Sequence, residues 1–343
     1  QALLILARDP EALFLLLVHL HPPPWWIERS PPEAEVRGSN PLGRAIFPAR
    51  ETPGSVSIGF AVTNKQSDNF KPGWDTGRIS TLWFDSHFNH AANRVIEWLV
   101  PVFSNGAGKD VLDFGCGGGI TTLGVALRHP EIQVHGVDIG DKFTQLSDLA
   151  REQLGLARLP DNLYLRRISP LQPLSAEYEL DAVFSWSVFE HVPRAQVPAI
   201  FRDLHGALKR KGFFFLQIEP LYYSPWGSHL RRFIDVPWAH LQWPTERLRR
   251  AVLDYEGEIP PQHRGHQYRA LDMEAFKRFH LKEFESLNRI TADEIVNMLQ
   301  DAGFTILKEQ RLNMKLPVPD DLLKIQGRET LLNNGLLLLG QKE

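Results

Sequence analysis

A strand, a glycine loop and a helix are predicted in one continuous stretch, residues 111–138, which constrains the fold more strongly than any other part of the chain. The apolar run at 111–114 is typical of a strand that is buried on both faces. Four glycines follow within five positions, and such a loop permits positive φ and lets a ligand approach the backbone closely. A helical apolar pattern at 120–129 and a second apolar run at 132–137 complete a β-α-β unit that ends on Asp138.

Two classes of cofactor are bound by such a unit. A dinucleotide site requires G-x-G-x-x-G, but that spacing fails here, because the third glycine position falls on Ile120 or, counted from Gly117, on Thr122. The chain instead has D-x-G-x-G-x-G from Asp113 to Gly119. This pattern resembles the first motif of class I S-adenosylmethionine (SAM) methyltransferases. SAM carries an ammonium and a sulfonium in place of a pyrophosphate, so a nearby carboxylate favours its binding.

The resemblance implies a Rossmann-like α/β fold with a seven-stranded, mostly parallel sheet of order 3-2-1-4-5-7-6, an antiparallel last strand and helices on both faces. It implies that the glycine loop passes under the methionine part, and that Asp138 accepts hydrogen bonds from the ribose hydroxyls. Many relatives have an acid after the third strand, where this chain has Ile168 to pack on the adenine and Ser169 to accept a hydrogen bond. Cofactor contacts are expected from Asp113, Gly115, Cys116, Gly117, Gly119, Asp138, Ile139, Ile168, Ser169, Ser185 and Trp186.

The remaining patterns follow the order of this family over residues 84–219 and 287–343. Residues 1–80 are interpreted as an N-terminal extension or cap, with a short helix at 11–19 and a strand at 55–63. Residues 81–343 form the predicted methyltransferase domain, in which 220–288 is an insertion expected to bind the substrate. Helices are predicted at 84–100, ended by Pro101, and at 141–154, 194–208 and 294–302, the last with a capping box at Thr291. Further strands are predicted at 162–167, 178–185, 213–218, 304–308 and 330–341, and the basic run 209–211 is predicted as a helix end and turn before the strand at 213.

Two histidines are candidates for the catalytic base. Residues 185–192, SWSVFEHV, resemble a run found in methyltransferases that act on small molecules. His191 could take a proton from an acceptor hydroxyl, because its unperturbed pKa lies near neutrality; packing against the following helix is an equally weighted alternative. His229, in the insertion, is the second candidate. Some relatives hold a divalent metal with Glu-x-x-Glu-His, but Ser187 stands at the first Glu position here, so no metal is expected.

Composition limits the partners. A net charge of −3 argues against a protein that binds nucleic acid. The apolar segment at 1–20 is interrupted by charged residues and a proline, so neither a membrane span nor a signal peptide is expected. A single cysteine, Cys116, fits a reducing compartment and a cytoplasmic location. The insertion is rich in aromatic, Arg and His residues, which suits a sugar, an aromatic ring or a lipid-like acceptor, although these aromatics could equally form the insertion's own core.

The function expected from the sequence is transfer of a methyl group from SAM to an oxygen, less readily a nitrogen, of a small-molecule, saccharide or lipid-like acceptor. Three alternatives remain open at this point. One is a protein that binds SAM without catalysis, and another is a methyltransferase that acts on a macromolecule. The third, an NAD-dependent oxidoreductase, is disfavoured by the glycine spacing. The oligomeric state is left open.

Overall fold

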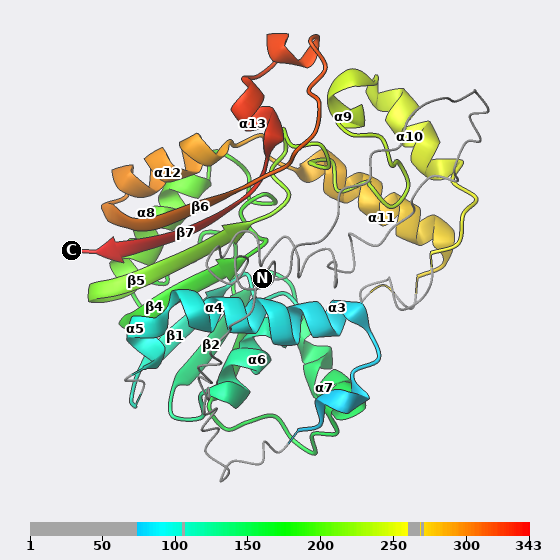
Figure 1. Cartoon of the computed structure of the whole chain (residues 1–343). Coiled ribbons are helices and arrows are strands. Elements are labelled where there is room, and N and C mark those ends of the chain that lie inside the picture. The colour runs from blue at the N-terminus through cyan, green and yellow to red at the C-terminus, as the bar shows by residue number, and fades with distance from the viewer. Residues whose placement is uncertain (1–73, 105–106, 260–267, 269–270) are drawn as a thin grey trace, which may run out of the picture.

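The computed structural model describes residues 74–343 except 105–106, 260–267 and 269–270 (Figure 1). The helix expected at 11–19 and the strand expected at 55–63 therefore lie outside the described residues. Within the part of the chain that is described, no helix has both the length and the apolar character needed to cross a membrane.

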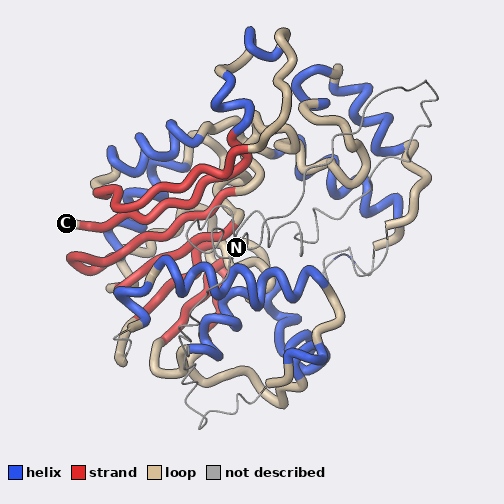
Figure 2. The backbone as a smooth tube through the Cα atoms, viewed as in Figure 1, coloured by secondary structure: helices blue, strands red, loops and turns tan. Residues whose placement is uncertain are grey.

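A seven-stranded sheet runs through the molecule in the order β3-β2-β1-β4-β5-β7-β6 (Figures 1 and 2). The strands β1 to β5 pair in parallel, whereas β7 lies antiparallel between β5 and β6. This arrangement confirms the predicted fold class. The strands are β1 (Asp110–Phe114), β2 (Gln133–Asp138), β3 (Leu163–Arg167), β4 (Leu180–Trp186), β5 (Leu208–Ile218), β6 (Phe304–Asn313) and β7 (Asn333–Lys342).

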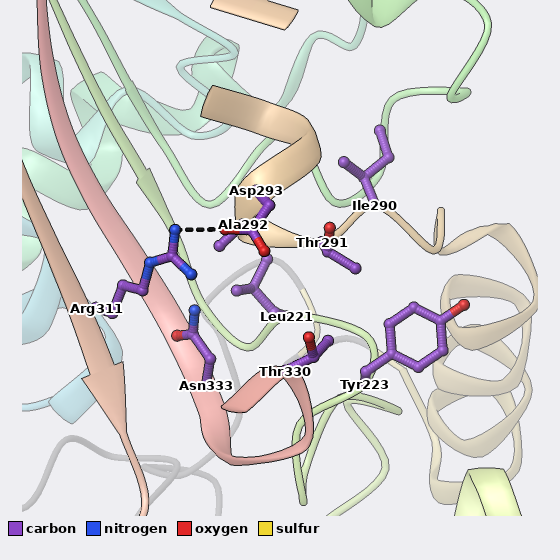
Figure 3. A pocket seen from close by; sticks show the side chains of 9 residues that line it. All are labelled: Leu221, Tyr223, Ile290, Thr291, Ala292, Asp293, Arg311, Thr330 and Asn333. Carbon is purple, nitrogen blue, oxygen red and sulfur yellow. Dashed lines mark hydrogen bonds and ion pairs between the residues drawn. The ribbon is translucent and has the colours of Figure 1, made fainter. Parts of the chain in front are cut away.

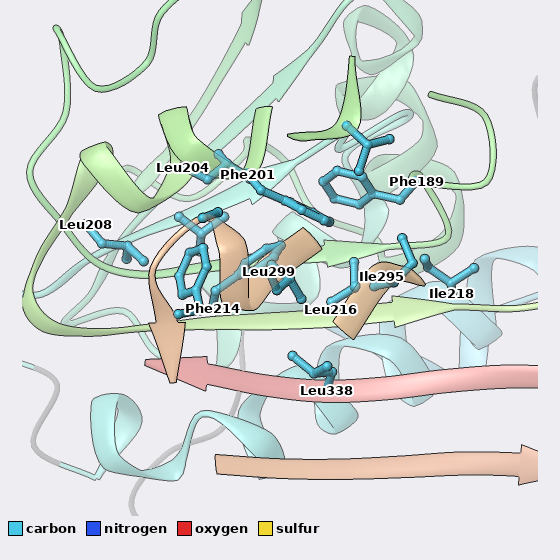
Figure 4. Close-up of a cluster of buried hydrophobic side chains, with 14 of the residues drawn as sticks. Phe189, Phe201, Leu204, Leu208, Phe214, Leu216, Ile218, Ile295, Leu299 and Leu338 are labelled. Atoms are coloured by element: carbon cyan, nitrogen blue, oxygen red, sulfur yellow. The ribbon is translucent and has the colours of Figure 1, made fainter. Parts of the chain in front are cut away.

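Helices cover both faces of the sheet, because successive side chains of a strand point to opposite faces and both sets are apolar here. One face is covered by α8 (Val197–Ala207) and α12 (Ala292–Asp301) (Figure 4). The other is covered by α4 (Ala92–Trp98) and α6 (Ile120–Arg128). The first face includes Phe214, Leu216 and Leu338, and the second includes Phe215, Leu337 and Leu339.

The helix predicted at 84–100 is present but is divided into segments. A π-helical segment, η2 (Ser86–Ala91), lies between α3 (Leu82–Asp85) and α4. At this segment the backbone touches α6, because a Cβ added to Gly124 would lie 2.6 Å from the Phe88 carbonyl oxygen. Pro101 was expected to end this helix near Val100, and α4 does end close by, at Trp98. Pro101 itself lies in the first turn of α5 (Val100–Phe103), where the missing N–H needs no partner.

The strand predicted at 213–218 begins earlier, at Leu208, so the basic run 209–211 belongs to β5 and not to a helix end and turn. The reason is a contact between neighbouring strands. The Asp181 carboxylate in β4 binds both Lys109 and Lys209 at 2.7 Å, which holds the start of β5 against β4 across a register shift between Leu180 and Ala182.

Short elements complete the sheet domain. The segment predicted to be helical at 141–154 is η3 (Lys142–Gln145) followed by α7 (Leu146–Leu154). The capping box predicted at Thr291 is present at the start of α12. The other short elements are η1 (Thr76–Arg78), η6 (Leu322–Lys324) and α13 (Arg328–Leu332).

The insertion after β5 forms a helical unit with a hydrophobic core of its own. Its helices are α9 (Ala239–Gln242), α10 (Thr245–Leu253) and α11 (Met273–Ser286). Figure 1 shows them grouped at the end of the sheet away from the C-terminus of the chain. Phe233, Phe276 and the half-buried Trp243 pack within this core, so part of the aromatic content of the insertion is structural.

Candidate functional site

The glycine loop between β1 and α6 has the backbone that its sequence predicted. Gly115, Gly117 and Gly119 have φ values of +81°, +54° and +75°, in the left-handed region that other residues adopt at a cost. The amides of Gly115 and Cys116 both donate to the Val137 carbonyl oxygen, at 2.9 and 3.0 Å. The loop is therefore fastened to the end of β2.

One side of the glycine loop has free space beside its backbone, and the other side is packed against a neighbouring side chain. A Cβ added at Gly117 or Gly118 would meet no atom within 4 Å, so a ligand can approach the backbone there. A Cβ at Gly115 would lie 2.5 Å from the nearer methyl carbon of Val188. Since Val188 follows β4, the segment that carries His191 is packed directly against the loop.

Asp138, at the end of β2, holds the loop through both of its carboxylate oxygens. Oδ2 accepts a hydrogen bond from the Gly117 amide at 2.9 Å, and Oδ1 accepts one from the Gly140 amide at 2.7 Å. Each carboxylate oxygen has a second lone pair, so Asp138 can still accept bonds from a ligand hydroxyl. The side chain is only half-buried, which leaves it accessible for this contact.

Asp113 lies beneath the loop, 2% exposed, and accepts a hydrogen bond from the Thr122 hydroxyl at 2.6 Å. Burial raises its pKa to about 7, an effect that the Thr122 hydrogen bond opposes and the Asp138 charge reinforces. Burial likewise raises the pKa of the Cys116 thiol. Cys116 is therefore a small packing residue within the loop, and its side chain lies against the Cα of Gly136, where a Cβ would be 3.0 Å away.

The residues expected at the adenine lie near the ends of β2 and β3 in different environments. Ile139 is 60% exposed, so its apolar side chain is available for contact with a ligand. Ile168 is buried in the core on the α8 face, and its amide donates to the Asp138 carbonyl oxygen at 2.9 Å. Ser169 is exposed, and its amide is bound by the Gln172 side chain. The adenine contacts remain predictions.

The end of β4 lies beside the glycine loop, as predicted. The Ser185 hydroxyl donates to the Phe114 carbonyl oxygen at 2.9 Å, which ties β4 to β1 and leaves this fully buried side chain within the protein. Trp186 packs edge-on to His90, with ring centroids 5.9 Å apart. Ser187 adopts φ +52°, and the Gln217 side chain accepts hydrogen bonds from both its amide and its hydroxyl.

The two histidines named as candidate bases are neighbours. The rings of His191 and His229 are nearly perpendicular, with centroids 5.4 Å apart. His191 follows β4 and His229 belongs to the insertion, so the fold brings together residues that are far apart in the sequence. His229 has φ +60°, and its Nε2 lies 3.4 Å from the Pro220 carbonyl oxygen.

The surroundings of the two histidines shift their pKa values to different degrees. Burial lowers the pKa of His229 to about 3, helped by neighbouring histidines, so this ring is neutral and a weak base. Burial also lowers the pKa of His191, but the Glu283 carboxylate opposes that effect, while Lys142 adds to it. His191 is therefore the better proton acceptor of the two.

Sequence reasoning missed two carboxyl groups at this edge of the sheet, one of them buried and the other half-buried. Glu190 is 5% exposed, and neither of its carboxyl oxygens has a hydrogen-bond partner in the structure. Burial and the nearby Glu219 raise its pKa to about 8. Burial also raises the pKa of Glu219 to about 7, although bonds from Asn334 and Gln217 oppose this. Glu219 directly follows β5, and Glu190 lies four residues after the end of β4, so their nearness to buried strand ends was the available signal.

A small pocket lies elsewhere, between the start of α12 and the strands β6 and β7 (Figure 3). Arg311 lines it but is already paired with Asp293 and Glu309, both at 2.6 Å. None of its lining residues comes from the loops that follow β1, β2 or β4, so this pocket is separate from the site described above. Across the described residues, there is no group of three or more His, Cys, Asp or Glu side chains placed to hold a metal ion.

The family of the chain follows from comparison with known proteins. The profile of a family described as a methyltransferase domain matches residues 87–309, more than half of the sequence, and the chain belongs to this family. Curated relatives include enzymes named for ubiquinone biosynthesis. The ubiquinone biosynthesis O-methyltransferase of Nitrosospira multiformis is 39% identical over 122 residues, which are 34% of this chain and 48% of that protein. The enzyme of the same name from Acinetobacter baylyi is 32% identical over equal shares.

The chain thus spans about half the length of the curated relatives it matches. Among solved structures, magnesium protoporphyrin IX methyltransferase from Synechocystis PCC 6803 with bound SAH is similar at 17% identity and a TM-score of 0.42. That match covers 76% of this chain and 85% of the other. It adds nothing to the topology already described.

Proposed function

We propose that this protein is a SAM-dependent methyltransferase that methylates an oxygen of a small-molecule acceptor. The observation that carries the proposal is the junction of β1, β2 and β4. There an open-sided glycine loop, bound by Asp138, meets the segment that carries His191, and a second half-buried histidine faces that residue. Family membership supports methyl transfer, and the names of the relatives support oxygen as the atom that is methylated.

The residues present suit SAM. The open side at Gly117 and Gly118 leaves room against the backbone, and Asp138 retains lone pairs for the ribose hydroxyls. The exposed Ile139 next to Asp138 offers an apolar contact for the adenine. Bound there, SAM would supply an electrophilic methyl group on a sulfonium.

Residues near the end of β4 would bind the acceptor and take its proton. The acceptor hydroxyl would give its proton to the His191 imidazole as its oxygen forms the new bond to the methyl carbon, and S-adenosylhomocysteine would leave with the electrons of the broken carbon–sulfur bond. His229, neutral and half-buried, would orient the acceptor and exclude water. Much of the rate would come from holding the two reactants in line.

Calorimetric titration of the chain with S-adenosylhomocysteine, with NAD as the control ligand, tests the cofactor. We expect saturable binding of the first alone. Binding of NAD alone would return the protein to the dinucleotide class, and binding of neither would remove the enzyme assignment.

Transfer itself is measured with methyl-labelled SAM and a panel containing a phenol, a catechol, an aniline and a monosaccharide. We expect label on a hydroxyl-bearing compound, reduced by at least about 100-fold in His191→Ala, the contribution typical of a general base. Transfer should persist in EDTA, because no metal is expected. Label confined to the aniline would contradict O-methylation.

A further inference from the structure

Helix α11 of the insertion brings a carboxylate to the candidate base. The Glu283 Oε2 atom lies 3.8 Å from Nδ1 of His191. That Nδ1 atom is buried and has no hydrogen-bond partner in the structure. At 3.8 Å the pair is an ion pair when the ring is charged, but it is too long for a hydrogen bond. An approach of about 1 Å would make one.

The same helix is fastened to the cofactor side of the domain. Lys142, in η3 shortly after Asp138, places its Nζ 5.6 Å from the ring centre of Tyr268 and 5.8 Å from that of Phe279. Phe279 stands four residues before Glu283, so both lie on one face of α11. This face therefore bridges the loop after β2 and the segment after β4, the two parts of the chain assigned to cofactor and acceptor.

We propose that Glu283 is the positioning residue for His191, binding Nδ1–H so that Nε2 is left free to accept the acceptor's proton. The inference rests on the proposed function for its catalytic meaning. The physical reason is that a neutral imidazole has one protonated nitrogen, and the hydrogen bond made by one nitrogen decides which. Without a partner at Nδ1, nothing in the site selects the tautomer that a base requires. The Glu283 carboxylate also stabilises the imidazolium formed when the proton arrives.

Four groups set the charge around His191. Glu283 on α11 favours the protonated ring, and Lys142 in η3 disfavours it. His229 in the insertion is neutral across the working range of pH. Glu190, the preceding residue, is held largely protonated up to a pH of about 8. The carboxylate of Glu283 is thus the principal negative charge acting on His191, opposed by the ammonium of Lys142.

The contact is tested by NMR titration of the histidine side chains in the full chain loaded with S-adenosylhomocysteine, or in the free chain if that ligand does not bind. His191 is assigned by the signal lost in His191→Asn. We expect Glu283→Gln to lower the midpoint of His191 and to reduce the Nδ1–H tautomer. Lys142→Met should raise the midpoint. Glu285→Gln, two residues along α11 and paired with Arg249, is the matched control and should change neither quantity.

An unchanged midpoint and tautomer in Glu283→Gln would overturn the inference, whether or not the chain transfers methyl groups. Failure of S-adenosylhomocysteine to bind would instead overturn the proposed function, and the two failures are thus distinct. With an acceptor in hand, Glu283→Gln should lower kcat about tenfold and move the acid limb of the kcat/KM profile to lower pH, with the KM for SAM unchanged. A lower kcat with an unmoved acid limb would show a packing role only and would also overturn the inference.

Discussion

Gly115 and Gly117 offer a paired test of how the glycine loop is built. Both residues have positive φ, so replacing either by Ala places a Cβ in the left-handed region at a cost of about 1–2 kcal/mol. They differ in their surroundings. The new Cβ at Gly117 meets nothing within 4 Å, whereas at Gly115 it lies 2.5 and 2.6 Å from the two methyl carbons of Val188. Overpacking of this kind adds about 1–3 kcal/mol.

We therefore expect Gly115→Ala to lower the free energy of unfolding by about 2–5 kcal/mol, and Gly117→Ala by about 1–2 kcal/mol. Urea denaturation followed by tryptophan fluorescence measures both. Adding Val188→Ala should recover about 1–3 kcal/mol of the loss in Gly115→Ala, because it removes both of the closest atoms. The same change should recover nothing in Gly117→Ala.

Equal losses in the two single variants, or no recovery with Val188→Ala, would refute the view that the segment after β4 is packed against the loop. The distinction matters for function, because that packing sets the distance between the loop and the segment carrying His191. A calorimetric titration with S-adenosylhomocysteine would show the functional side of the same effect. Gly117→Ala should weaken binding although it clashes with no protein atom, since its Cβ would project into the open side of the loop.

Three further changes test other parts of the site and the core. Asp138→Ala should weaken S-adenosylhomocysteine binding at least about tenfold in calorimetry, because it releases the amides of Gly117 and Gly140 as well as removing the proposed ribose contact; unchanged binding would contradict this. Glu190 has a raised pKa of about 8 in the folded protein, so its contribution to stability is complete below the unfolded pKa near 4.5 and is lost as the pH rises towards 8. Glu190→Gln should therefore gain stability over wild type at pH 8 relative to pH 5 in urea unfolding, and an equal difference at both pH values would contradict the buried, unpaired carboxyl. Phe201→Ala should cost about 3–5 kcal/mol by the same measurement, because its ring is fully buried in the core of Figure 4, and a loss below about 1 kcal/mol would show that this core collapses around the gap.

The backbone of the glycine loop could be predicted from sequence because its signals are local, while the cofactor contacts assigned to it stay predictions. The glycine spacing from Asp113 to Gly119 dictates positive φ at fixed positions, and a carboxylate at the next strand end follows from the β-α-β geometry. The structure confirms the backbone at Gly115, Gly117 and Gly119. The sheet order could be predicted because the apolar runs fall in the order that the family resemblance implies.

Long-range contacts explain where the sequence predictions were wrong. The basic run 209–211 was predicted as a helix end and turn, which is what local charge near a helix indicates. The buried end of Asp181 binds Lys209 from the neighbouring strand, and no pattern within the run contains that information. The π-helical turn before α4 likewise depends on Gly124, more than thirty residues along the chain, which admits the Phe88 carbonyl.

The acceptor half of the site was only partly predictable, for a reason that also bears on how the site works. His191 and His229 could be named from their chemistry, but their proximity depends on how the insertion folds back over the sheet. The same fold-back determines which of the two is the better proton acceptor. Protonation of His229 is strongly disfavoured, whereas His191 has a carboxylate at 3.8 Å supplied by the insertion itself. Because the sheet carries the proposed base and the insertion carries the carboxylate beside it, we expect a change in the insertion to alter the basicity of His191 without altering the cofactor loop.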